Sequence, residues 1–328
     1  QYISMEVPDK KTGELKLWTP TNANGKFSND SVTLRRAFAQ SINSIAVRLG
    51  QEMGIKNIIK TAQDMGINSP LDDEPSLALG SSDVNLLEMV NAYCTIADNG
   101  MHHEPVLVTK IIDQDGNEVY TGPSDSHQVL SARTAFFMQN LLEGGITEPG
   151  GTSRGLASYV TTYDTDWGGK TGTSNNHSDA WFMAVSPKLV VGAWVGGEYR
   201  SIHFRTGALG QGSRTALPIC GYFLNALLKD PKFKKYRAKF KDSQDPDITK
   251  DMYECASYVQ PVKHQSYADS TEVINENIEL DEDGNPITTP KDQKEATPSA
   301  SSDNKKDQTD SKKKDTPKRP KEVTMEDF

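Results

Sequence analysis

Two apolar runs in the middle of the chain show the composition of β-strands. They cover residues 179–185 and 189–197, they are rich in β-branched and aromatic side chains, and a short polar segment around Pro187 separates them. A glycine-rich stretch, 168–174, precedes them and also has the pattern of a strand. The sequence therefore predicts an antiparallel three-stranded meander with the 168–174 strand first, followed by a helix over 215–228.

Helical spacing dominates nearer the start of the chain. Apolar residues recur there every three or four positions, at Leu34, Phe38, Ile42, Ile45 and Leu49. Residues two apart on a helix do not face each other, so Ser41 and Asn43 can reach one cleft only if the helix is interrupted within 40–44. The polar side chains of that stretch are expected to cap the break through bonds to the backbone. Polar residues that merely cap a helix junction are the alternative.

Composition divides the chain into a folded part and a tail. The 328 residues include 35% hydrophobic ones, enough for a large core, but large apolar residues thin out after Tyr258. From Asp281 onward Asp, Lys, Pro, Ser and Thr predominate, and such a segment buries too little surface to offset its ordering entropy. We predict a domain over 1–258 and a disordered tail over 259–328. The net charge of −9, without a clustered basic face, argues against nucleic acid as a partner.

The chemically most suggestive stretch is 168–174. Lys170 brings a cation on a flexible stem, and Thr171 and Thr173 share one face of a strand because they lie two apart. Gly172 lets another backbone approach closely. These groups can hold a peptide carboxylate beside a nucleophile. A second Lys-Thr-Gly, at 11–13, is expected to be only a turn before a short strand.

These motifs resemble the C-terminal, transpeptidase part of class A (bifunctional) penicillin-binding proteins. The resemblance extends from about Trp18 to about Lys229. Its main carriers are Trp18-Thr-Pro-Thr-Asn22, Val32-Thr-Leu-Arg-Arg-Ala37, Ser41-Ile-Asn43, Leu77-Ala-Leu-Gly80, Leu86-Leu-Glu-Met-Val-Asn-Ala-Tyr93, Gly151-Thr152, Gly169-Lys-Thr-Gly-Thr173, Asp179-Ala-Trp-Phe182 and Ala216-Leu-Pro218. As a set they are highly specific.

The resemblance implies an α+β fold of the β-lactamase and transpeptidase type, an antiparallel sheet with helices on both sides. It also implies D,D-transpeptidation of peptidoglycan stem peptides through a serine acyl-enzyme, with β-lactams as covalent inhibitors and no cofactor. The implied catalytic residues are Ser41, Asn43, Lys170 and Thr173, and the implied substrate-binding residues are Thr171, Gly172 and Thr173. In these roles Ser41 relays a proton, Asn43 bonds the substrate peptide and Thr173 N–H donates to the oxyanion.

The family's nucleophile lies in a Ser-x-x-Lys motif several tens of residues before the Ser-x-Asn motif, and Ser41 is too close to Gln1 to leave room for it. We therefore expect a fragment, inactive alone, whose parent has a glycosyltransferase domain and an N-terminal membrane anchor upstream and works at the periplasmic face of the inner membrane. Ser302 and Ser311 also begin Ser-x-x-Lys spellings, but they lie in the predicted tail.

Two other functions stay open from the residues alone. A β-lactamase needs a carboxylate base, and Glu88 occurs at a suitable point in the order, although its helical context favours a surface role. A non-catalytic module could use the same groove to bind stem peptides or sense β-lactams. Ser174, His177 and Asp179 are close in sequence, which fixes no triad geometry. Cys94 and Cys220 are expected to be buried free thiols on helices.

Overall fold

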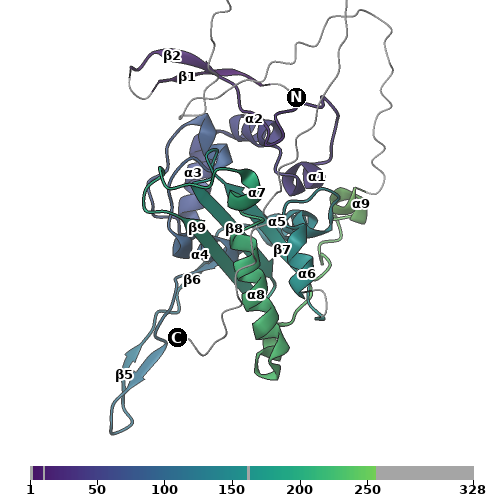
Figure 1. The fold of residues 1–328 in the computed structure, drawn as a ribbon. Coiled ribbons are helices and arrows are strands. Elements are labelled where there is room, and N and C mark those ends of the chain that lie inside the picture. The colour runs from purple at the N-terminus through teal and green to yellow at the C-terminus, as the bar shows by residue number, and fades with distance from the viewer. Residues whose placement is uncertain (1–2, 10–11, 161–162, 256–328) are drawn as a thin grey trace, which may run out of the picture.

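A three-stranded antiparallel sheet forms the centre of the computed structural model, which describes residues 3–9, 12–160 and 163–255 (Figure 1). The strands are β7 (Gly168–Thr173), β8 (Asp179–Ser186) and β9 (Leu189–Gly196), in the order β7-β8-β9. Lys170 pairs with Met183 and Trp181 with Trp194. The predicted meander is confirmed.

Helices cover both faces of this sheet. On one face lie α4 (Leu86–Ala97) and α5 (Ala132–Thr147), and on the other lies α8 (Ala216–Lys229), flanked by α6 (Ala157–Val160). The α8 face is held by a buried cluster that includes Phe182, Leu217 and Leu224, and the α4–α5 face by one that includes Leu142 and Val185. The α+β architecture with helices on both sides is therefore as predicted.

The remaining elements surround this core. They are α1 (Leu34–Ala39), α2 (Asn43–Met53), α3 (Ile55–Asp64), α7 (Gly207–Gly210), α9 (Lys250–Glu254) and the short 3-10 helices η1 (Pro75–Leu79), η2 (Arg154–Leu156) and η3 (Pro231–Tyr236). Three small antiparallel pairs join β1 (Met5–Pro8) with β2 (Leu15–Trp18), β3 (Met101–His103) with β6 (Ser126–Gln128) and β4 (Lys110–Ile112) with β5 (Glu118–Thr121). The β1–β2 and β4–β5 hairpins project from the body (Figure 1). Thr12 lies in a turn before β2, as expected for the second Lys-Thr-Gly.

After α8 the chain folds back across α5. Asp166 N–H donates to Ala238 O at 2.9 Å, Arg133 pairs with Asp245 at 3.1 Å, and the rings of Phe136 and Tyr253 meet edge to face with centroids 5.1 Å apart. The predicted tail, 259–328, lies outside the described residues. None of the helices in the described part of the chain combines the length and the apolar character needed to cross a bilayer.

One burial prediction was wrong. Cys220 is buried in α8, but Cys94 is exposed. The buried stripe of α4 runs through Ala92, Thr95 and Ile96, so Cys94 turns outward on the side that also exposes Leu87.

Candidate active site

Ser41 owes its position to a left-handed turn between α1 and α2. Ser41 N–H donates to Phe38 O and Ile42 N–H donates to Ala37 O, both at 3.0 Å, and Ser41 itself has φ 55°. This is the Schellman arrangement that ends many helices, with serine at the position that glycine usually occupies. The turn breaks the helix where the sequence predicted a break, and α2 restarts at Asn43.

The capping of this break differs from the prediction. The first residue before α2, Ile42, has no side-chain cap, and the free N–H of Ser44 is instead bonded by Asn22 Oδ1 at 3.2 Å. Gln40 donates to Pro149 O at 2.9 Å and Asn43 donates to Thr21 O at 2.7 Å. The Gln40 and Asn43 side chains therefore bind distant segments rather than their own helix ends.

Lys170 joins the central sheet to this turn. Its Nζ donates to Ser41 Oγ at 2.9 Å and to Thr171 O at 2.7 Å. Burial lowers the pKa of the Lys170 ammonium to about 8, because the charged form loses water in this position. Lys170 is thus mostly charged at neutral pH but close enough to its pKa to release and recover a proton.

The outer edge of β7 has no strand partner among the described residues. The bond from Ser174 N–H to Asp179 O, 3.0 Å long, sets the phase of the β7–β8 ladder. Because antiparallel ladders alternate, the backbone groups of Thr171 and Thr173 then point away from β8. Among the described strands β7 pairs only with β8, so these groups lie on an edge without a strand partner, where Thr171 O accepts from Lys170 Nζ.

The site side chains reach this edge from opposite faces of the sheet. Lys170 lies on the α4–α5 face with its partner Met183, whereas Thr171 lies on the α8 face with Phe182. Thr171 Oγ1 donates to Thr152 Oγ1 at 2.8 Å, and Thr173 Oγ1 accepts from Gly212 N–H at 3.1 Å. A ligand at the edge would therefore meet the cation on one side and the hydroxyls on the other.

The closely packed loop that carries Thr152 was not identified as part of the site from the sequence. Thr152 N–H donates to Ala39 O at 2.9 Å, and Ser153 N–H donates to Gly145 O at 3.1 Å. A Cβ on Gly145 would come within 2.4 Å of Gly169 O, and one on Gly151 within 2.4 Å of Gly145 O. Only glycine allows this approach of α5, the loop and β7, so the glycines in these three segments were the available signal.

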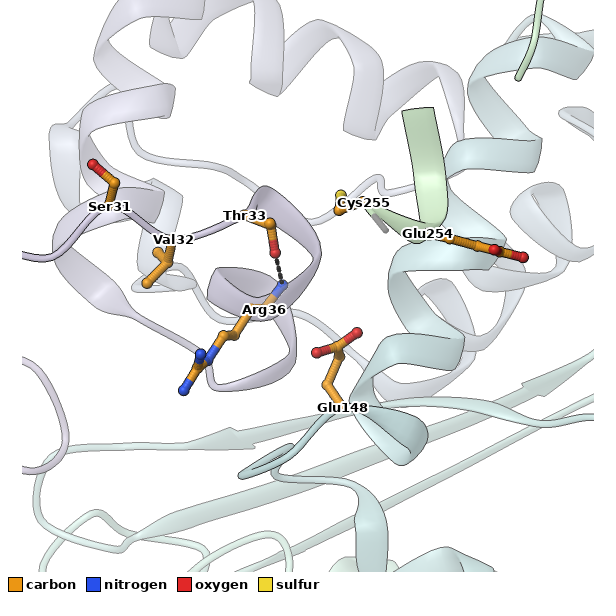
Figure 2. Close-up of a pocket in the computed structure, with 7 residues that line it drawn as sticks. All are labelled: Ser31, Val32, Thr33, Arg36, Glu148, Glu254 and Cys255. Carbon is orange, nitrogen blue, oxygen red and sulfur yellow. Dashed lines mark hydrogen bonds between the residues drawn. The ribbon is translucent and has the colours of Figure 1, made fainter. Parts of the chain in front are cut away.

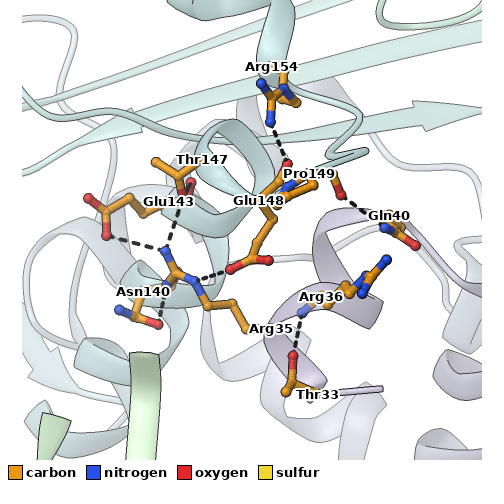
Figure 3. A network of polar contacts seen from close by, with 10 residues as sticks. All are labelled: Thr33, Arg35, Arg36, Gln40, Asn140, Glu143, Thr147, Glu148, Pro149 and Arg154. Carbon is orange, nitrogen blue, oxygen red and sulfur yellow. Dashed lines mark hydrogen bonds and ion pairs between the residues drawn. The ribbon is translucent and has the colours of Figure 1, made fainter. Parts of the chain in front are cut away.

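Arg35 fixes α1 against the end of α5 (Figure 3). Its guanidinium donates to Glu148 at 3.1 Å, to Thr147 Oγ1 at 3.1 Å and to Asn140, and it lies 3.8 Å from Glu143. Burial raises the pKa of Glu143, and the Arg35 charge opposes that shift. Since α1 leads directly to Ser41 and α5 packs on β7, this network helps to set the distance between Ser41 and Lys170.

A pocket near α1 includes Glu148 of this network in its lining (Figure 2). It is lined by Ser31, Val32, Thr33, Arg36, Glu148, Glu254 and Cys255. Figure 2 shows the Thr33 hydroxyl accepting from Arg36 N, the bond that begins α1. None of the predicted site residues lines this pocket.

Two alternative assignments lose support from the geometry. Glu88 accepts from Ser69 Oγ at 2.6 Å, a bond that lowers the pKa of Glu88 and makes it a weaker base. Asp179 accepts from Trp194 Nε1 at 3.0 Å and from Ser178 Oγ at 2.8 Å, while His177 Nδ1 is buried without a partner. Ser174, His177 and Asp179 therefore form no triad.

Comparison with known proteins places the chain in a family. The model of the penicillin-binding protein transpeptidase domain matches residues 6–195, more than half of the chain. Penicillin-binding protein 2D of Bacillus subtilis is 35% identical over 186 residues, and penicillin-binding protein 1A of Aquifex aeolicus is 33% identical over 202 residues. These alignments cover 55% and 62% of this chain but only 26% of either relative.

Solved structures agree with this placement. Penicillin-binding protein 1A from Haemophilus influenzae superposes with a TM-score of 0.64 at 26% identity, over 76% of this chain and 40% of that one. The PonA1 protein from Mycobacterium tuberculosis, solved in complex with penicillin V, has the same fold at a TM-score of 0.58 and 21% identity, over 69% of this chain and 62% of that one. This chain is a member of the penicillin-binding protein transpeptidase family.

Proposed function

We propose that this chain supplies the peptide groove and the proton relay of a serine-type D,D-transpeptidase that crosslinks peptidoglycan stem peptides. The observation that carries the proposal is the 2.9 Å bond from Lys170 Nζ to Ser41 Oγ beside the open edge of β7. β-Lactams are the expected covalent inhibitors, in keeping with the penicillin V complex of PonA1. The parent protein is expected at the periplasmic face of the inner membrane, held there by an N-terminal anchor.

An extended peptide can bind by adding a strand to β7. The outward backbone groups of Thr171 and Thr173 offer main-chain bonds, a mode that recurs in peptide recognition. The terminal carboxylate would lie near Thr171 and Thr173, with the Lys170 cation on the other side of the edge. Gly172 has no side chain to obstruct this edge, and Asn43, near Ser41, would bond the peptide of the donor.

The reaction begins with a serine from the Ser-x-x-Lys segment expected outside this chain. Its Oγ gives its proton to the lysine of that segment and attacks the carbonyl carbon that precedes the terminal residue. The C–N bond then breaks to give an acyl-enzyme and a free amine. The amine needs a proton, which Ser41 Oγ–H can donate while Lys170 returns one to Ser41. Thr173 N–H would stabilise the oxyanion, a contact typically worth about 3 kcal/mol.

The second half of the reaction reverses the proton path. An acceptor amine attacks the acyl carbon and loses its proton to Ser41, which passes one back to Lys170. The crosslink forms as the serine leaves and recovers its proton from the lysine of the Ser-x-x-Lys segment. A Lys170 pKa of about 8 suits both directions, because general acids and bases work best when their pKa is near the operating pH. The groups named here need no cofactor for this sequence of steps.

The test is labelling by a fluorescent penicillin in the full-length protein that carries this chain and its nucleophile. We expect Lys170→Met and Ser41→Ala to slow acylation by about 100-fold or more, the usual contribution of a general acid or base. Lys188→Met, which changes an exposed lysine in the turn after β8, is the control and should label like the unchanged protein. Labelling of all four proteins at one rate would refute the assignment of the relay.

A further inference from the structure

The hydroxyls of Thr171 and Thr152 form a short chain that ends on the turn before Ser41. Thr171 Oγ1 donates to Thr152 Oγ1 at 2.8 Å, and Thr152 Oγ1 donates to Ala39 O at 3.4 Å. Thr152 N–H also donates to Ala39 O, at 2.9 Å. The first bond is strong and the second lies near the limit of hydrogen bonding.

This arrangement conflicts with carboxylate binding as it stands. A hydroxyl has one proton, and a carboxylate only accepts hydrogen bonds. The Thr171 proton is already given to Thr152, so Thr171 has none to offer a carboxylate in the groove. Thr173 differs, because its oxygen accepts from Gly212 N–H at 3.1 Å and its proton is therefore free to turn toward a ligand.

The weak bond from Thr152 Oγ1 to Ala39 O allows the Thr171 proton to be released for the carboxylate. If Thr152 turns its proton from Ala39 O to Thr171 Oγ1, the Thr171 proton can turn to the carboxylate. Ala39 O keeps the bond from Thr152 N–H, so the reversal leaves it with a partner. The new chain, from Thr152 through Thr171 to the anion, is cooperative, since each bond polarises the next.

We propose that Thr152 is a positioning residue for the substrate carboxylate, and that its hydroxyl reverses its hydrogen-bond direction when the anion enters beside Thr171. The inference rests on the proposed function, which requires that a carboxylate occupies this groove. Thr152 is placed for the task by the close contacts of Gly145, Gly151 and Gly169, which leave the loop little freedom to move.

The experiment compares acylation by penicillin with acylation by its neutral methyl ester, in the full-length protein with its nucleophile. We expect Thr152→Val to slow the reaction with penicillin by about three- to tenfold, the worth of one hydrogen bond, and to leave the reaction with the ester within about twofold. Thr152→Ser keeps the hydroxyl and should restore the rate with penicillin. The double variant with Thr171→Val should be no slower than Thr171→Val alone, because the two hydroxyls act as one unit.

Controls separate this role from a structural one. Thr61→Val removes a hydroxyl that bonds only within α3, to Asn57 O, and should change neither rate. Thr152→Ala is the second hydroxyl-free variant, and it also keeps the backbone bond to Ala39 O. Equal slowing of penicillin and ester, or no slowing of penicillin, in both hydroxyl-free variants would overturn the inference while leaving the proposed function intact. An unchanged protein that penicillin fails to acylate would overturn both.

Discussion

Replacing Lys170 should alter stability in a way that changes sign with pH. Burial lowers the Lys170 pKa from 10.5 to about 8. At about 1.4 kcal/mol for each tenfold change in the ionisation constant, the charged form costs about 3 kcal/mol in the folded state. Lys170→Met removes this cost but also loses the bonds to Ser41 Oγ and Thr171 O, worth about 1 kcal/mol each.

Proton linkage gives the direction in which the stability difference between the variant and the unchanged chain varies with pH. Between about pH 8 and 10.5 the unfolded chain binds more protons at this lysine than the folded one, so the stability of the unchanged protein rises with pH across that window. Below about pH 8 the lysine is charged in both states and the full cost is present. At about pH 7 the variant should therefore be more stable by about 1 kcal/mol, and above about pH 10.5 less stable by about 2 kcal/mol.

Urea unfolding of the 328-residue chain at several pH values measures this difference. Other groups that titrate at high pH are common to both proteins, so they cancel when the variant is compared with the unchanged chain at each pH. Lys188→Met, at an exposed position, should show a difference that does not depend on pH. A constant difference between Lys170→Met and the unchanged chain from about pH 7 to 10.5 would refute the view that burial perturbs Lys170.

Two further outcomes are expected. Arg35→Met leaves Glu143 and Glu148 without their shared cation. Because these groups are only partly exposed, the variant should lower the free energy of unfolding, measured by urea titration, by about 2–4 kcal/mol. A loss below about 0.5 kcal/mol would show that the network in Figure 3 adds little to stability. The isolated 328-residue chain should take up no covalent penicillin, because its Ser-x-x-Lys spellings, at Ser302 and Ser311, lie in the predicted tail. A mass increase of one drug molecule mapped to Ser41 or Ser174 would contradict the placement of the nucleophile.

Features that depend on residues close together in the sequence were predicted correctly. The meander followed from runs of β-branched and aromatic residues, and the helix break followed from the need for Ser41 and Asn43 to act together. The structure brings Ser41 to Lys170 across 129 positions. This contact could be expected only through the resemblance to a family, because periodicity says which face a residue takes but not which distant segment covers it.

Contacts made by loops were not predicted either, because the sequence pattern does not identify partners that are distant along the chain. Thr152 bonds both Ala39 O and Thr171 Oγ1, and neither partner is near it in sequence. Asn22 caps α2 from 22 positions away. Gln40 and Asn43, which were predicted to cap the helix break, bind Pro149 O and Thr21 O instead. The prediction that Cys94 is buried failed because α4 has apolar residues on several sides, and such a sequence does not reveal which side meets the sheet.

At Ser41 the residue that the left-handed turn favours differs from the residue that the proposed reaction needs. A non-glycine residue at φ 55° carries a conformational cost of about 1 kcal/mol or more, so for folding alone glycine would be the better residue in this turn. Glycine has no hydroxyl to receive the Lys170 proton. A variant selected only for thermal resistance would thus drift toward glycine here and lose the proposed relay. Screens for activity would instead keep a serine that the fold itself does not favour.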